Sequence, residues 1–280
     1  MDETRIADLS EKLRMSGKYR DLCDDTLRRI ASCAALRHPR QKEALKAAKQ
    51  KLHQIYGAYA ERLDMNAIDA SVDSLAGVPP EAVPQVCLEI LKRHASAAER
   101  IPALAETYQR LWAQTGTPRA VLDLACGLNP FALPWMNLPR TVCYVAIDID
   151  RRLTAAIGRF LAALGQNGEA VCSDALVATP DIDVDMVLLL KALPCLEQQE
   201  KGASLRLIRA LKSRWTVVSF PTHSLGGRQK GMADHYARFM EGLASELGCD
   251  VFTWTVRNEA FYLCGQTPGG PPFGTTKRIP

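Results

Sequence analysis

The 280-residue sequence lacks the features that define several large classes of protein. No apolar run approaches the roughly 20 residues needed to cross a bilayer, and the polar opening Met1 to Arg5 lacks the pattern of a secretory signal peptide. The nine cysteines are scattered and form no Cys-x-x-Cys pair, which argues against a disulfide framework and against zinc. We therefore expect a cytoplasmic, globular protein with reduced thiols, no metal site and no membrane partner.

A complete dinucleotide-binding fingerprint is also missing. Residues 119–124 have the pattern of a short buried strand, and Gly127 follows where the backbone must turn tightly and approach a ligand. The fingerprint Gly-x-Gly-x-x-Gly is not completed, because Leu128, Asn129 and Pro130 come next. Without a glycine-lined turn, no helix N-terminus is brought onto a pyrophosphate. A cofactor without phosphates, S-adenosylmethionine, therefore fits this turn better than NAD.

A second strand follows at the spacing expected for an adenosine-binding site. Residues 142–147 form this strand, and it ends at Asp148, whose carboxylate can accept both hydroxyls of a ribose. A structural glycine and a helix-capping aspartate would explain the same two residues taken singly. The strand context and the spacing between Gly127 and Asp148 favour the cofactor.

Hydrophobic periodicity divides the chain into a helical first part and an alternating second part. Residues 4–115 show helical spacing almost throughout, and strands alternate with helices from residue 119 onward. This alternation predicts an α/β fold, a parallel sheet with helices on both faces and a final antiparallel hairpin. Strands are expected at 119–124, 142–147, 169–173, 184–190, 215–220, 250–257 and 260–264, and helices at 150–164, 197–212 and 232–246. The expected domains are 1–105 and 106–265, followed by a disordered tail at 266–280.

Several polar residues fall where ligands bind such a sheet, at the carboxyl ends of its strands. Asp174 is placed to bond an adenine amino group or, equally, to start a loop. Ser96 and Glu99 have the spacing of a helix capping box. Arg100, just inside that helix, can pair with a ligand carboxylate.

Two basic stretches flank a less basic middle, which is the pattern of a phosphate-backbone footprint or of solvated helix faces. Residues 26–62 hold nine Lys or Arg against two Glu, and residues 205–240 hold seven against one Asp. A glycine-rich basic loop at 222–231 adds cations near the predicted site. The candidate RNA contacts are Arg28, Lys46, Lys49, Lys51, Arg228 and Lys230.

Several stretches together resemble one family, the aminoglycoside-resistance 16S ribosomal RNA guanine-N7 methyltransferases. The Gly-Leu-Asn-Pro turn and the Ser-Phe-Pro-Thr block, in this order and spacing, are the specific ones. The matching stretches are Ser16 to Arg20, Lys51 to Tyr59, His94 to Arg100, Asp123 to Pro130, Asp148 to Asp150, Leu188 to Pro194 and Val218 to Met232.

The resemblance implies a class I S-adenosylmethionine-dependent methyltransferase, Rossmann-like with a seven-stranded sheet, and an all-helical N-terminal domain that docks on the 30S ribosomal subunit. It implies methylation of N7 of guanine 1405 in the decoding site of 16S rRNA, which blocks 4,6-disubstituted deoxystreptamine aminoglycosides. We expect a monomer, in which Arg100 would hold the methionine carboxylate. Carried over by motif, the cofactor neighbours would be Tyr59, His94, Ala95, Ser96, Arg100, Ala125, Gly127, Asp148, Asp174, Ala175, Leu190 and Gln199.

The sequence also lacks the Asn/Asp-Pro-Pro-Tyr motif that holds an exocyclic amine in amino-directed methyltransferases; Leu190 to Pro194 stand in its place. Guanine N7 has a free lone pair and no proton to lose, so rate can come from alignment alone. We therefore assign no catalytic acid or base. Lys191 is a poor candidate, because a cation would oppose the positive charge that develops on the base.

Four other functions stay open from the sequence. The main alternative is a methyltransferase that acts on a small molecule or on another RNA site; the basic helices of residues 26–62 disfavour the small molecule. A Rossmann oxidoreductase is disfavoured by the missing glycines. A non-catalytic RNA-binding module is the fourth.

Overall fold

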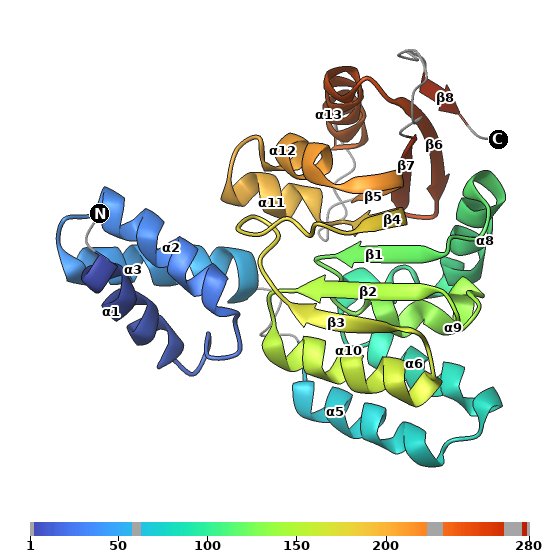
Figure 1. Cartoon of the computed structure of the whole chain (residues 1–280), viewed down its shortest axis with the longest axis horizontal. Coiled ribbons are helices and arrows are strands. Elements are labelled where there is room, and N and C mark those ends of the chain that lie inside the picture. Colours follow the sequence, from blue (N-terminus) through green and yellow to red (C-terminus); the bar gives the residue numbers. More distant parts are fainter. Residues whose placement is uncertain (1–2, 58–62, 223–231, 266–275, 279–280) are drawn as a thin grey trace.

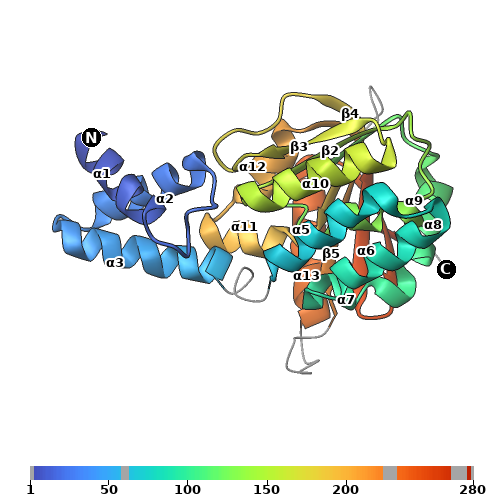
Figure 2. The ribbon, with the colours of Figure 1, turned by 90° about the horizontal axis from the view of Figure 1, so that it is seen from below.

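The computed structural model describes residues 3–57, 63–222, 232–265 and 276–278. A three-helix unit at the N-terminus lies beside a larger unit built on a single sheet (Figures 1 and 2). The strands at the centre of the sheet point toward the three-helix unit, so their carboxyl ends face it (Figure 1). Within these described ranges, no helix is long and apolar enough to cross a membrane.

The N-terminal unit has a hydrophobic core of its own. It consists of α1 (Glu3–Arg14), α2 (Asp24–Arg37) and α3 (Gln41–Leu52), and α3 continues as a π-helical turn, His53–Gly57. Each helix turns an apolar stripe inward, and burial of such stripes is the main source of stability for short helices. The side chains of this core include Ile6, Leu9, Leu13, Leu27, Ile30, Ala44, Ala48 and Leu52. The helical spacing predicted for this part of the chain is confirmed by these elements.

The larger unit is built on one twisted sheet with the strand order β3-β2-β1-β4-β5-β7-β6-β8. Strands β1 to β5 are parallel, and β7 pairs antiparallel with both β5 and β6. The bounds are β1 (Ala120–Leu124), β2 (Cys143–Asp148), β3 (Gly168–Cys172), β4 (Asp183–Leu190), β5 (Lys212–Pro221), β6 (Asp250–Val256), β7 (Glu259–Gly265) and β8 (Thr276–Arg278). The seven predicted strands and the final hairpin are confirmed.

The eighth strand lies in the segment that we predicted to be disordered. Residues 276–278 pair in parallel with β6 at the edge of the sheet. The prediction of disorder is therefore wrong for these residues, because backbone pairing at a sheet edge requires no hydrophobic side chains. The rest of that tail, 266–275 and 279–280, lies outside the described residues.

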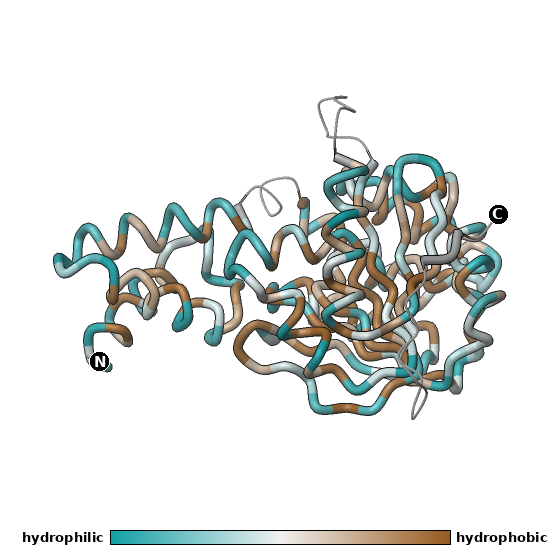
Figure 3. The backbone as a smooth tube through the Cα atoms, turned by 90° about the horizontal axis from the view of Figure 1, so that it is seen from above, coloured by the Kyte–Doolittle hydropathy of each residue, from teal (hydrophilic) through white to brown (hydrophobic). Residues whose placement is uncertain are grey.

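Helices cover both faces of the sheet, and apolar residues concentrate between them and the strands (Figure 3). One face is covered by α5 (Met65–Ser74), α6 (Val83–Leu91), α8 (Leu104–Thr115), α9 (Leu133–Met136) and α10 (Arg151–Leu164). The other face is covered by α11 (Leu193–Gln199), α12 (Ala203–Ala210) and α13 (Met232–Leu247). Short helical turns lie at Leu75–Gly77, Pro80–Ala82, Ala95–Ala98 (α7), Ile101–Ala103 and Asn129–Ala132.

Two sequence-based predictions of helices are wrong. The single helix predicted at 197–212 is two helices, because Gly202 adopts a left-handed conformation with φ of 81° between α11 and α12. The capping box is also absent, since His94 is the N-cap of α7 and Ser96 lies inside the helix. Glu99 is instead the C-cap residue of α7, and its side chain forms an ion pair with Lys191.

The helices between residues 65 and 115 pack against the sheet rather than against α1 to α3. Ile68, Ile90 and Leu104 belong to the same hydrophobic cluster as β1 and β2. The cores thus divide between residues 57 and 63, on either side of a segment outside the described residues. The domain boundary near residue 105 stays a prediction.

Candidate functional site: a cavity at the carboxyl ends of the strands

A cavity of about 280 Å³ opens at the carboxyl ends of β1, β2 and β4, where this sheet type binds ligands. All the described residues in our set of cofactor neighbours line it except Ala95, and Tyr59 lies outside the described residues. The geometry thus brings the predicted residues together, and their binding roles stay predictions. Those lining the cavity are His94, Ser96, Arg100, Ala125, Gly127, Asp148, Asp174, Ala175, Leu190 and Gln199.

The turn after β1 is held to the end of β2 by the carboxylate of Asp148. Ala125 and Gly127 both have positive φ, 51° and 50°, which lets the chain reverse beside the cavity. For Ala125 this conformation is strained, as is common at functional sites. The Gly127 N–H donates to Oδ2 of Asp148 at 2.9 Å, and the Asp150 N–H donates to Oδ1 at 3.1 Å. Burial nevertheless raises the pKa of Asp148 to about 6.

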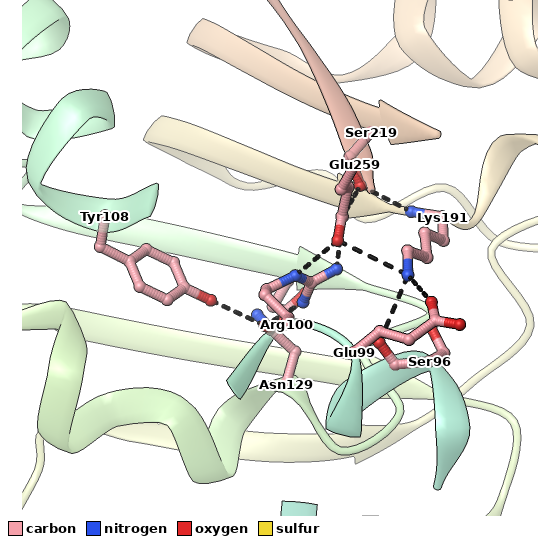
Figure 4. Close-up of polar contacts among 9 residues, drawn as sticks. Ser96, Glu99, Arg100, Tyr108, Asn129, Lys191, Ser219 and Glu259 are labelled. Atoms are coloured by element: carbon pink, nitrogen blue, oxygen red, sulfur yellow. Dashed lines mark hydrogen bonds and ion pairs between the residues drawn. The ribbon is translucent and has the colours of Figure 1, made fainter. Parts of the chain in front are cut away.

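Arg100 lies in a buried network at the cavity wall (Figure 4). Its Nε and Nη2 donate to the two carboxylate oxygens of Glu259, at 3.0 and 2.6 Å, and its Nη1 donates to Oδ1 of Asn129 at 2.9 Å. Lys191 lies 3.6 Å from Glu259 and 2.9 Å from Glu99. Burial opposes ionisation of Glu259, but the Arg100 and Lys191 charges prevail and hold its pKa below the usual range.

Sequence reasoning missed Glu259. The hairpin turn at 257–259 was recognised, but the strand register that points this side chain at Arg100 could not be read from the sequence. In the structure Glu259 is 4% exposed and sits opposite Pro221 of β5. The sequence carried one signal for this role, since Glu259 is a charged residue at the start of an otherwise apolar strand.

Asn129 occupies the position of the second glycine in the Gly-x-Gly-x-x-Gly fingerprint. Its Oδ1 accepts from Arg100 and from the Tyr108 hydroxyl at 2.7 Å, and its Nδ2 donates to Oδ2 of Asp123 at 2.9 Å. The Tyr144 hydroxyl donates to the same Asp123 oxygen at 2.7 Å. Burial raises the pKa of Asp123 to about 7. The amide of Asn129 therefore joins Arg100 to β1 through an interior hydrogen-bond network.

Asp174 is bonded to the N-terminal unit as well as lining the cavity. Its Oδ2 accepts from the Thr26 hydroxyl and from Arg29 Nε, each at 2.9 Å, and its Oδ1 accepts from the Leu176 N–H at 3.0 Å. The Leu176 contact is the loop-starting role considered for this residue. Arg29 Nη2 also donates to Oε1 of Gln199 at 2.7 Å.

The predicted RNA contacts have different surroundings. Lys46 and Lys49 are exposed on α3, away from the core of the three-helix unit. Arg28 is exposed and forms an ion pair with Glu3, and Lys51 donates to the Gln198 carbonyl at 2.8 Å across to α11. Arg228 and Lys230 lie outside the described residues. Lys46 and Lys49 are therefore the strongest candidates for contacts with an outside partner.

Three of the five described cations in the second basic stretch are paired with neighbouring acids. Arg206, Arg209 and Lys212 form ion pairs with Glu200, Glu246 and Asp181, respectively. Lys212 begins β5, at the end of the strand away from the cavity. The basic composition of residues 205–240 therefore does not amount to a continuous free basic surface over the described part.

The strand order, the helices on both faces and the cavity at the carboxyl ends of the strands define a class I S-adenosylmethionine-dependent methyltransferase. A family model described as ribosomal RNA methyltransferase (FmrO) matches residues 15–263. The chain belongs to this family of ribosomal RNA methyltransferases.

Relatives and solved structures cover nearly the whole chain. The 16S rRNA (guanine(1405)-N(7))-methyltransferase of Micromonospora rosea is 37% identical over 265 residues, 93% of this chain and 97% of that protein. The protein of the same name from Serratia marcescens is 37% identical over 238 residues, 85% of this chain and 89% of its own. The structure of the 16S rRNA methyltransferase RmtF in complex with S-adenosyl-L-homocysteine is similar, with a TM-score of 0.81, 34% identity, and coverage of 95% of this chain and 100% of that one.

Proposed function

We propose that this protein transfers a methyl group from S-adenosylmethionine to N7 of guanine 1405 in 16S rRNA, and so confers resistance to 4,6-disubstituted deoxystreptamine aminoglycosides. The observation that carries the proposal is the match, along nearly the whole chain, to proteins named 16S rRNA (guanine(1405)-N(7))-methyltransferase. The earlier alternatives of a small-molecule methyltransferase and a Rossmann oxidoreductase lack such relatives among the matches described.

The donor and acceptor groups at the cavity fit the three polar parts of S-adenosylmethionine. Asp148 can accept the ribose hydroxyls, and Asp174 the adenine amine. A guanidinium has five N–H donors, of which Arg100 uses three for Glu259 and Asn129. Two remain for a carboxylate, which supports the proposed contact with the methionine end.

The proposed reaction requires the protein to orient the substrates and does not require proton transfer. The bound cofactor supplies an electrophilic methyl group, and guanine N7 offers a lone pair without a proton to remove. The residues at the cavity therefore have to fix position and exclude water. Leu190 and Leu196 supply apolar wall, while Lys191 is committed to Glu99 and Glu259. This arrangement supports the assignment of no general base.

We further propose that the enzyme acts as a monomer, in the cytoplasm, on the assembled 30S subunit. The separate core of α1 to α3 and the exposed cations of α3 support a docking role for this unit. The phosphate backbone gives most of the affinity for such a basic surface. The target base must leave its stack to reach the cavity.

The decisive experiment incubates the purified protein with radiolabelled S-adenosylmethionine and either 30S subunits or free 16S rRNA. We expect label in the subunit, mapped to guanine 1405 by chemical cleavage at N7-methylated sites. Label in free rRNA alone would refute the subunit as substrate. Absence of label from all rRNA, with the cofactor still bound, would refute the proposed reaction.

A further inference from the structure

The helix α2 of the N-terminal unit reaches the wall of the cavity through two side chains. Arg29 contacts Asp174 and Gln199, and Thr26 contacts Asp174, across 145 to 170 positions of sequence. These side chains are well covered, with exposed fractions of 14% for Arg29 and 4% for Asp174. Because this ion pair is largely buried, solvent screens it little. It therefore restricts the orientation of both the Arg29 and the Asp174 side chains.

The two oxygens of Asp174 have different partners, because Oδ2 is bonded to the N-terminal unit and Oδ1 to a backbone N–H of its own loop. Oδ2 accepts from the Thr26 hydroxyl and from Arg29 Nε, which fills its two lone pairs, and Arg29 Nη2 lies 2.8 Å from it in the ion pair. Oδ1 accepts from the Leu176 N–H and keeps one lone pair. Because Oδ2 is held from one side, the carboxylate cannot rotate freely, and Oδ1 is the oxygen left for a ligand.

Arg29 fixes a second residue of the cavity in the same way. Its Nη2 donates to Oε1 of Gln199, which leaves the amide nitrogen of that side chain as the free donor. The planar guanidinium thus holds two neighbouring wall residues with a single rigid fork. By contrast Arg28, one residue earlier, points to Glu3 on the exposed surface.

We propose that Arg29 is a positioning residue that, with Thr26, orients Asp174 to recognise the exocyclic amine of the cofactor's adenine, and so couples cofactor binding to the seating of the N-terminal helices. This inference rests on the proposed function, since it takes S-adenosylmethionine as the ligand. The coupling is reciprocal, because anything that strengthens one side of the shared carboxylate contact must strengthen the other by the same factor. Cofactor binding therefore tightens the attachment of α1 to α3 to the sheet unit.

The test compares two ligands that differ only at the C6 and N1 edge of the purine. S-adenosylhomocysteine and S-inosylhomocysteine, in which an oxo group replaces the amine and N1 carries a proton, are titrated calorimetrically into wild type and Arg29→Met. We expect wild type to prefer the adenosyl ligand about tenfold or more, as charge-assisted hydrogen bonds allow. Arg29→Met should lose most of this preference, and Arg29→Lys, which keeps the charge without the fork, should lose part of it.

Matched variants separate positioning from general loosening. Thr26→Val removes the hydroxyl that contacts Asp174 and the Cys23 thiol, and it should reduce the same preference to a smaller degree. Arg14→Met removes an ion pair of 2.8 Å to Asp24 within the N-terminal unit and should leave the preference unchanged. If Arg29→Met does not fold, Thr26→Val and Arg29→Lys carry the test.

Equal weakening of both ligands by Arg29→Met, or no weakening of either, would overturn the inference, and so would a wild type that does not discriminate between them. Failure of wild type to bind S-adenosylhomocysteine at all would instead overturn the proposed function. Ligand preference and rRNA methylation are measured separately, so the two failures are distinguishable.

Discussion

The guanidinium of Arg100 and the carboxylate of Glu259 form a bidentate ion pair with a shortest distance of 2.6 Å, although 159 positions separate them in sequence. Their side chains are 7% and 6% exposed. The pair joins the segment after α7 to the hairpin formed by β6 and β7. The proposed contact with the cofactor carboxylate therefore depends on a residue from the far end of the chain.

Glu259→Gln should destabilise the protein strongly, because it leaves Arg100 buried beside a neutral partner. We expect a loss of about 3–5 kcal/mol in the free energy of unfolding, the usual cost of breaking a buried pair. Urea unfolding measures it. The matched surface variant Glu246→Gln breaks the exposed pair with Arg209 and should cost about 0–1 kcal/mol. Similar losses for the two variants would show that the buried pair is not structurally important.

The affinity for S-adenosylhomocysteine should fall as the pH drops through about 6. Burial raises the pKa of Asp148 to about 6, and its ionised form is the proposed acceptor for the ribose hydroxyls. Each pH unit below that value should cost up to about tenfold in affinity, since one proton must be released on binding. Calorimetry between pH 5 and 8 is the measurement. Asp148→Asn should bind weakly with a flat profile, and an unchanged profile in this variant would assign the titration elsewhere.

The pH dependence of stability should carry a contribution from Asp123. Its pKa is raised by burial from 3.8 to about 7, so the folded state retains the proton while the unfolded chain loses it. Stability from this group is therefore complete below pH 4 and is lost as pH rises toward 7, by at most about 1.4 kcal/mol per unit. Unfolding of wild type and Asp123→Asn across this range measures the difference. Parallel curves for the two proteins would contradict the assignment.

Charge reversal on α3 should separate substrate docking from cofactor binding. Lys46→Glu with Lys49→Glu is expected to slow methylation of 30S subunits at least about tenfold and to reduce the salt dependence by about one unit of log–log slope per lost phosphate contact. Binding of S-adenosylhomocysteine should not change. The control reverses Lys92, the C-cap residue of α6, and Arg110, a partly exposed residue of α8. Equal effects of both double variants would mean that net charge, rather than this surface, governs docking.

The local parts of the site could be predicted from the sequence, and the long-range parts could not. Gly127 and Asp148 follow strands whose apolar patterns are continuous, so their position at the carboxyl ends follows from topology. Glu259 and Arg29 depend on strand register and on how α2 sits against the sheet unit, neither of which leaves a periodic signal. For Ser96 and Glu99 the local spacing predicted a capping box. In the structure Glu99 instead forms a long-range ion pair with Lys191, so the local motif was misleading.

The break between α11 and α12 also depends on packing that the local sequence does not show. Gly202 was not read as a break, because a single glycine inside an amphipathic pattern is tolerated in many helices. Its left-handed conformation is decided by the packing of α11 and α12 against the sheet. Core positions of β1 and β4, by contrast, were evident from their apolar runs.

The carboxylate of Asp148 gives the cavity a negative charge without a paired cation among the described residues, and this charge should affect product release. Its carboxylate accepts backbone N–H groups, and within the part of the chain that the structure describes no cation forms an ion pair with it. Arg29, Arg100 and Lys191, by contrast, are each matched by an acid. The unmatched negative potential attracts a ligand that carries a sulfonium cation and loses its hold once that charge departs with the methyl group. Spent cofactor should therefore leave more readily than fresh cofactor, which limits product inhibition.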